Sequence, residues 1–133
     1  MPYEGLGARH TVEAATKACR HGQIVVEDGF VGSAFKVDQV DRFVRPVDAQ
    51  DIAIGEEFEI QLGGIHEAPA EGALAALGVG DPVFITEADN TLVAAGGAGI
   101  LPVGIVTEVD ASRDPDVLRI NSNVWQPFER GEV

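Results

Sequence analysis

Hydrophobic and polar residues alternate over several short stretches of this chain, and the alternation predicts a mainly β fold. The clearest case is residues 57–62, where Phe58, Ile60 and Leu62 share one face of a strand and are expected to point inward. Further strands are expected at 23–27, 30–37, 82–86, 91–94, 103–109 and 117–120. Short strands at this spacing favour a small single-domain β-barrel or sandwich.

Turn residues divide these strands. Asp28-Gly29 is a strong signal for a hairpin turn, and Gly32 in the returning strand indicates a possible bulge. The Ala-rich stretch 70–77 predicts one short helical segment that ends at Gly78.

Two regions are less regular. Residues 11–20 fit a helix capped by Thr11 with Val12, Ala15 and Cys19 on one face, but their alternation fits a strand equally, so both interpretations stay open. Residues 1–9 contain Pro2, Gly5 and Gly7 without periodicity, which is typical of an arm. The expected organisation is an N-terminal arm at 1–10, a β-rich domain at 11–121 and a C-terminal tail at 122–133.

Composition and charge narrow the function classes. The 133 residues are 45% hydrophobic, enough for a real core, and carry a formal net charge of −13. That charge disfavours binding to nucleic acid or an anionic membrane, and neither a membrane span nor the apolar core of a signal peptide is visible. Residues 1–45 balance six basic and six acidic groups, whereas residues 46–112 contain twelve carboxylates and no Lys or Arg. Most of these carboxylates are therefore expected to face water or a partner.

Candidate chemistry is sparse. Cys19 is the only cysteine, which predicts a buried thiol in a reducing compartment rather than a disulfide or nucleophile. The three histidines have no zinc spacing, and the glycine-rich stretches lack the context of a phosphate-binding loop. Neither a nucleophile elbow nor a calcium loop is present. The sequence therefore predicts no enzyme activity, cofactor or metal.

The tail carries an aromatic pair, Trp125 and Phe128, after the last predicted strand. Such a pair either folds back on the core or anchors a partner, and the sequence leaves both possibilities open.

The order of these segments resembles that of a known family. The stretches 22–26, 30–34, 54–65, 77–84, 101–106 and 117–120 together are similar to small phage proteins long catalogued as a domain of unknown function. That family resembles the head decoration, or capsid cement, proteins of tailed phages. The resemblance implies a β-rich protein, made in the host cytoplasm, that binds the major capsid protein on the exterior of the virion, with a homotrimer favoured.

Under this reading the function is binding and not catalysis. The expected contact residues are Pro2, Tyr3, Leu6 and Arg9 of the arm, together with Trp125 and Phe128 of the tail. Deleting residues 2–9 is expected to weaken attachment and leave the fold intact. The alternative is a free-standing β-barrel adaptor or carbohydrate-binding module on a virion or cell surface. Charge suggests that the balanced N-terminal end meets the shell and the acidic body faces solvent.

Overall fold

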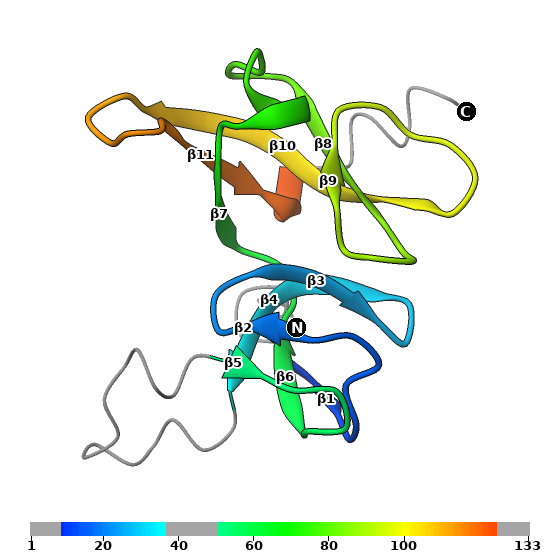
Figure 1. Cartoon of the computed structure of the whole chain (residues 1–133). Coiled ribbons are helices and arrows are strands. Elements are labelled where there is room, and N and C mark those ends of the chain that lie inside the picture. Colours follow the sequence, from blue (N-terminus) through cyan, green and yellow to red (C-terminus); the bar gives the residue numbers. More distant parts are fainter. Residues whose placement is uncertain (1–8, 37–50, 125–133) are drawn as a thin grey trace.

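Eleven short strands form two sheets and a two-stranded ribbon in the part of the chain that the structure describes (Figure 1). The structure is a computed structural model and describes residues 9–36 and 51–124. The strands are β1 (Arg9–Val12), β2 (Cys19–Arg20), β3 (Ile24–Glu27), β4 (Phe30–Lys36), β5 (Asp51–Ile52), β6 (Phe58–Gln61), β7 (Ile65–Pro69), β8 (Pro82–Thr86), β9 (Leu92–Val93), β10 (Ile100–Asp110) and β11 (Val117–Asn121). Two 3₁₀ turns, η2 (Gly72–Leu74) and η3 (Ser122–Val124), complete the elements.

The N-terminal lobe, defined as residues 9–36 and 51–62, contains the sheet β1-β6-β4-β3 and the ribbon β2-β5. The predicted hairpin is confirmed: β3 and β4 pair as Glu27 opposite Phe30, with Asp28 at φ 55° and Gly29 at φ 81° in the turn between them. Two successive left-handed residues are what a tight hairpin turn requires. Phe58 and Ile60 are fully buried and Leu62 packs beside them, as the alternation predicts.

Gly32 is not the site of a bulge. The register of β3 and β4 runs without a break through Val25 opposite Gly32, so the prediction was wrong at this position. A Cβ atom on Gly32 would lie 2.0 Å from the carbonyl oxygen of Gln61 on β6. Glycine is needed here because the backbones approach closely, and close approach is a second reason for glycine within a strand.

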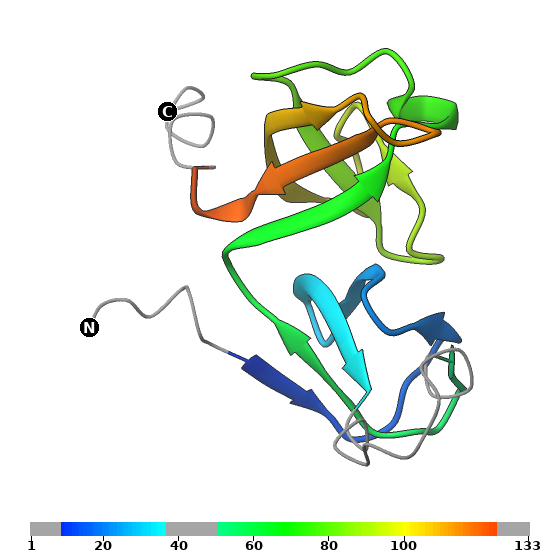
Figure 2. The same ribbon diagram turned by 90° about the vertical axis from the view of Figure 1, so that its left-hand side faces the viewer.

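The C-terminal lobe, defined as residues 64–124, contains the sheet β7-β11-β10-β8-β9. Its long central strand, β10, shifts register between Pro102 and Gly104 and again between Val106 and Glu108. Such irregularities increase local bend and twist, in keeping with the curled half-barrel seen in Figure 2. The predicted helical segment is the single turn η2, whose Leu74 is buried in the core.

β3 joins the two lobes into one domain. All four of its residues are buried, and Ile24 and Val26 pack into the core of the C-terminal lobe with Val83 and Ile85. Val25 points the other way, into the core of the N-terminal lobe. A strand buried on both faces reads as a continuous apolar run, as this one does. The prediction of a small, mainly β single domain with a short helical segment is confirmed.

Residues 11–20 form neither a helix nor one continuous strand. β1 ends at Val12, an irregular loop follows, and β2 begins at Cys19. The buried carboxylate of Glu27 holds this loop, because it accepts hydrogen bonds from the backbone N–H of Thr16 (2.9 Å) and from its hydroxyl. Side chain to backbone bonding of this kind competes with regular structure, and neither alternative from the sequence anticipated it.

Candidate interaction surface

Of the six predicted contact residues, the structure describes Arg9 alone. Arg9 is exposed at the start of β1, where its guanidinium lies 3.2 Å from a carboxylate oxygen of Glu59 and 4.4 Å from the ring centroid of Phe35. Pro2, Tyr3, Leu6, Trp125 and Phe128 lie outside the described residues. The predicted arm covers residues 1–10, and the structure has its last two residues, Arg9 and His10, in β1.

The carboxylates of the cation-free middle segment are partly neutralised by basic groups from elsewhere in the chain. Asp51 pairs with Arg20, Glu56 with Lys36 and Glu59 with Arg9, while Glu67, Glu108 and Asp110 all pair with Arg119. Six of the twelve carboxylates therefore have a basic partner from a distant segment, and several of these, such as Asp51 and Glu108, are still exposed to solvent as expected. Strand pairing brings distant segments together, which a local charge count does not capture.

Arg119 is the centre of the largest ion-pair group in the described part of the chain. It lies on β11, between β7 and β10, and contacts Glu67 at 3.0 Å, Glu108 at 3.0 Å and Asp110 at 3.5 Å. Hydrogen bonds to Glu67 and Glu108 raise the pKa of Arg119. The pKa of Asp110 is lowered, first by hydrogen bonds from Ser112 and then by the charges of Arg119 and Arg113.

The remaining negative charge is concentrated in the C-terminal lobe. That lobe has nine carboxylates and two basic groups, compared with seven and four among the described residues of the N-terminal lobe. Glu71, Asp81, Glu87 and Asp89 have no basic partner among the described residues. This surface repels other acidic surfaces and attracts basic ones.

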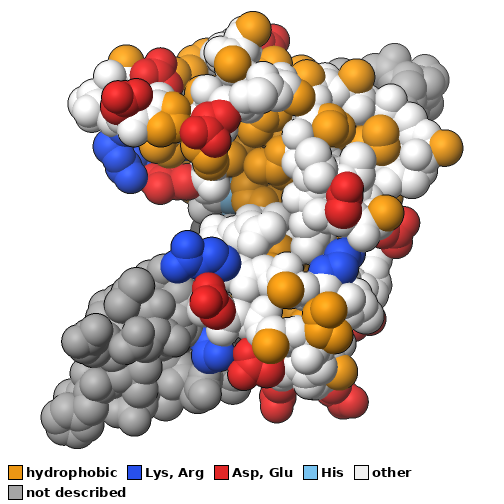
Figure 3. All heavy atoms as spheres, viewed as in Figure 1, with side chains coloured by type: hydrophobic (Ala, Val, Ile, Leu, Met, Phe, Trp, Pro, Cys, Tyr) orange, Lys and Arg blue, Asp and Glu red, His pale blue; other side chains and the backbone are white. Residues whose placement is uncertain are grey.

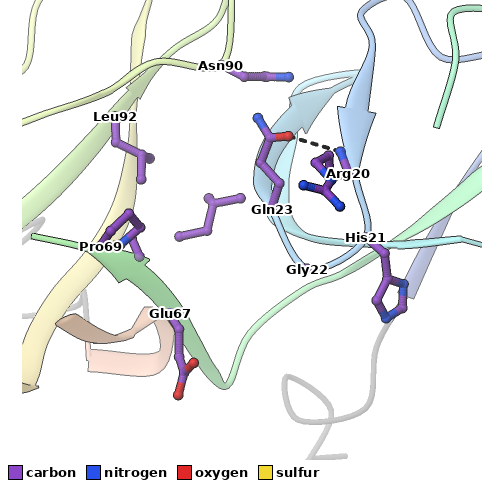
Figure 4. Close-up of a pocket in the computed structure, with 10 residues that line it drawn as sticks. Arg20, His21, Gly22, Gln23, Glu67, Pro69, Asn90 and Leu92 are labelled. Atoms are coloured by element: carbon purple, nitrogen blue, oxygen red, sulfur yellow. Dashed lines mark hydrogen bonds between the residues drawn. The ribbon is translucent and has the colours of Figure 1, made fainter. Parts of the chain in front are cut away.

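A groove of about 520 Å³ separates the two lobes on one side of the molecule (Figure 3). Its walls are residues 20–24 of the N-terminal lobe and 67–69 of the C-terminal lobe, together with Asn90 and Leu92. Apolar side chains are exposed in this recess in Figure 3. In the close-up, Leu92 and Pro69 lie opposite Gln23, whose side-chain oxygen accepts the backbone N–H of Arg20 at 3.0 Å (Figure 4).

Polar contacts fix the two lobes on either side of the groove. Lys17 Nζ donates to the carbonyl oxygens of Val26 (3.0 Å) and Glu87 (2.7 Å), so it joins β3 to the β8–β9 turn. The side-chain oxygen of Asn90 accepts the backbone N–H of Val26 at 2.9 Å. The bonds to Val26 satisfy buried backbone groups, and together with the bond to Glu87 they hold the walls in a defined position.

His66 forms a second link between the lobes. Its Nδ1 lies 2.5 Å from the hydroxyl of Ser33 on β4, and its Nε2 lies 3.4 Å from the hydroxyl of Ser122 in η3. The ring is almost fully buried and has no charged hydrogen-bond partner, and burial lowers the pKa of His66. His66 is therefore a neutral structural residue.

The prediction that the Cys19 thiol is buried is confirmed. Cys19 is buried and unpaired, and burial, reinforced by the charge of Glu27, raises its pKa to about 11. A thiol with that pKa is protonated at neutral pH and is a poor nucleophile. His21 accepts a backbone N–H of Lys36, and residues 9–36 and 51–124 contain no cluster of three potential metal ligands.

Sequence reasoning missed both the groove and the Arg119 group. Pro69, at the end of β7, is the one sequence signal for an edge strand here, because proline cannot donate to a sheet ladder. No sequence signal identifies the strand that lies opposite it.

The described surface combines an apolar groove with a strongly acidic lobe, and both features suit contacts with another protein. The family model of phage cement proteins matches residues 6–120, and the chain belongs to that family. The family is structural and stabilises phage capsids, so the chain is a virion component that associates with a capsid. No curated protein and no solved structure matches the chain. None of the described helices is long and apolar enough to cross a membrane.

Proposed function

We propose that this protein binds the major capsid protein on the outer surface of a phage head, as a homotrimer and without catalysis, and so stabilises the shell. The match to phage cement proteins over residues 6–120 is the observation that carries the proposal. Synthesis in the host cytoplasm, before attachment, is part of it and agrees with the single reduced cysteine.

The ends of the described chain support one attachment face. Figure 2 has the start of β1 and the end of η3 on the same side of the molecule, next to the link between β6 and β7. The described chain therefore begins at Arg9 and ends at Val124 on one side of the molecule. Pro2, Tyr3, Leu6, Arg9, Trp125 and Phe128 are the contact residues in this proposal.

The acidic surface of the C-terminal lobe is expected to face away from the shell. η2, which follows Glu71, lies on the opposite side of the C-terminal lobe from the two chain ends in Figure 2. With the chain ends against the shell, that carboxylate faces solvent. Like charges displayed around a particle keep particles apart.

Stabilisation follows from binding alone. A protein that binds the assembled shell and not its dissociated subunits stabilises the shell by mass action. Many copies at symmetry-related positions, and several contacts within each trimer, add avidity to contacts that are individually modest. No bond has to be made or broken.

The proposal is tested with empty shells of the cognate phage that lack this protein. Purified protein is added back, and the bound fraction is measured by co-sedimentation and the solution mass by light scattering. Saturable binding and a trimer mass are expected. A correctly folded protein that stays in the supernatant at every concentration contradicts the proposed function.

The arm has its own test. Because Arg9 and His10 belong to β1, a deletion of residues 2–8 leaves the described domain complete. This deletion is expected to weaken shell binding at an unchanged melting temperature. Binding equal to wild type removes the arm from the contact surface.

A further inference from the structure

β7 presents an unpaired edge to the groove. In an antiparallel pair, alternate residues direct their N–H and C=O groups toward the partner strand and the rest direct them away. Ser122 donates to the carbonyl of Gly64 (3.0 Å) and Ala70 donates to that of Asp116 (2.8 Å), in register with the pairing of β7 and β11. The even-numbered residues of β7 therefore face β11. The N–H and C=O groups of Ile65 and Glu67 face the other way, where no described residue bonds them.

The groove begins at this edge. Three consecutive residues of β7, 67–69, line it, as expected when a strand is approached from its side rather than its face. β3 forms part of the opposite wall as the last strand of its own sheet. The outward groups of Val26 on β3 are bonded by Asn90 and Lys17, but those of Ile24, one repeat earlier, have no bonding partner among the described residues. β7 thus provides an open strand edge along an apolar groove, and the buried strand β3 provides part of the facing wall.

A second copy of the chain is a poor occupant for the β7 edge. Glu67 is the central residue of β7, so symmetric antiparallel pairing of two copies places two Glu67 side chains opposite or diagonal to each other. Like charges at those positions are destabilising. Glu67 pairs with Arg119, but the three carboxylates around that guanidinium stay net negative even with Arg113 beside Asp110. Charge complementarity therefore favours a segment with basic side chains.

We propose that β7 binds a short extended segment of the capsid subunit, which adds to the sheet at the groove. This inference rests on the proposed function and names the chemistry of its partner. The segment pairs with Ile65 and Glu67 and ends near Pro69, which has no N–H to donate. Its side chains on the buried side of the sheet are apolar, to meet Leu92 and Ile24 in the groove. Its outward side chain beside Glu67 is Lys or Arg.

Two variants at one position separate the backbone contribution from that of the side chain. Both variants, Glu67→Ala and Glu67→Pro, remove the carboxylate and its ion pair with Arg119, and Glu67→Pro alone also removes the outward N–H. Neither loses a ladder bond to β11, and proline is tolerated at strand edges. E67A is expected to bind cognate empty shells within about threefold of wild type, and E67P about tenfold more weakly than E67A, because it loses a hydrogen bond and adds a clash.

Hydrogen exchange on the wild-type protein gives a measurement that does not depend on a variant folding. The amides of Ile65 and Glu67 are expected to exchange rapidly in the free protein and slowly on shells, while those of His66 and Ala68 stay protected in both. The inference is overturned if E67P binds shells as tightly as E67A and both edge amides of the wild type stay unprotected on shells. That result leaves the proposed function standing. Wild type that fails to bind shells overturns both. Protection that rises with protein concentration in the absence of shells identifies a second copy as the occupant and also overturns the inference.

Discussion

At the residue scale, the fold depends on a few positions where only one side chain fits. A Cβ atom added to Gly32 would lie 2.0 Å from the carbonyl oxygen of Gln61, and one added to Gly104 would lie 2.7 Å from the carbonyl oxygen of Asn121. Asn90 holds a left-handed conformation, φ 60°, and uses its side chain to bond a strand in the other lobe. Steric exclusion and one buried hydrogen bond, rather than catalytic chemistry, explain these residue types.

Gly32→Ala is expected to destabilise the protein by about 3 kcal/mol. The added Cβ meets backbone at 2.0 Å, so β4 and β6 must separate, as in other overpacked sites. Gly78→Ala is the control, because nothing lies within 4 Å of its Cβ position and its φ is not positive. Urea denaturation measures both. Equal stability of the two variants contradicts the close approach at Gly32.

His66 predicts a loss of stability in mild acid. Burial lowers the pKa of His66 below the ordinary value of 6.5, so the unfolded chain takes up protons first as the pH falls. The contribution of neutral His66 to the free energy of unfolding is complete above pH 6.5 and declines below it. Burial also lowers the pKa of His21, so His21 changes the stability in the same direction. The pKa values of Glu56, Asp89 and Asp110 are also lowered, and the stability that these carboxylates contribute is lost in a more acidic range than that of the histidines.

The test is the free energy of unfolding of wild type and His66→Gln at pH 7.5, 6.5 and 5.5. Glutamine has both a donor and an acceptor for the two serines but does not titrate. The variant is expected to show a shallower decline between pH 6.5 and 5.5, and His21→Gln controls for the other shifted histidine. A decline as steep as that of wild type rules out His66 as its source.

At the element scale, the two sheets are held by β3 and the elements that bond it. β3 supplies apolar side chains to both cores and backbone bonds to β4. On its outer edge, the carbonyl oxygen of Val26 accepts a hydrogen bond from Lys17 in the β1–β2 loop, and the N–H of Val26 donates to Asn90 in the β8–β9 turn. β11 has a similar place in the C-terminal lobe, where Arg119 joins carboxylates on both neighbouring strands. The groove is therefore bordered by strands that pack firmly elsewhere.

Two substitutions at Asn90 test the link between the β8–β9 turn and β3. Asn90→Ala leaves the buried N–H of Val26 without its acceptor and places alanine at φ 60°, so a loss of about 3 kcal/mol is expected. Asn90→Gly loses the same bond but tolerates the backbone, and is expected to cost about 1 kcal/mol less. Thermal denaturation compares them. A glycine variant less stable than the alanine variant contradicts this interpretation.

At the scale of the whole molecule, the sequence predicts the elements better than their assembly. The alternation around Phe58 and the Asp28-Gly29 turn depend on residues near each other in the chain, so both were predicted correctly. The bulge at Gly32 was wrong, because the residue responds to a backbone 29 positions away. The protein family, by contrast, is indicated by the order of the segments along the chain. The resemblance of that order to phage cement proteins therefore predicted the family correctly.

The candidate site was less accessible to prediction. The groove needs β3 beside β7, and the Arg119 group needs three strands in register, so neither exists before the sheets assemble. The ion pairs of the carboxylates at 51–110 were not predicted for the same reason, because their basic partners lie in distant segments. The predicted contacts at Pro2, Tyr3, Leu6, Trp125 and Phe128 stay predictions, and shell binding by variants of these residues will decide them.

Capsid stabilisation by this protein is measurable as the temperature at which shells open. Empty cognate shells are heated with and without saturating protein, and disruption is followed by calorimetry. The opening temperature is expected to rise with protein concentration until the sites are full. An opening temperature unchanged by protein that co-sediments with the shells contradicts capsid stabilisation.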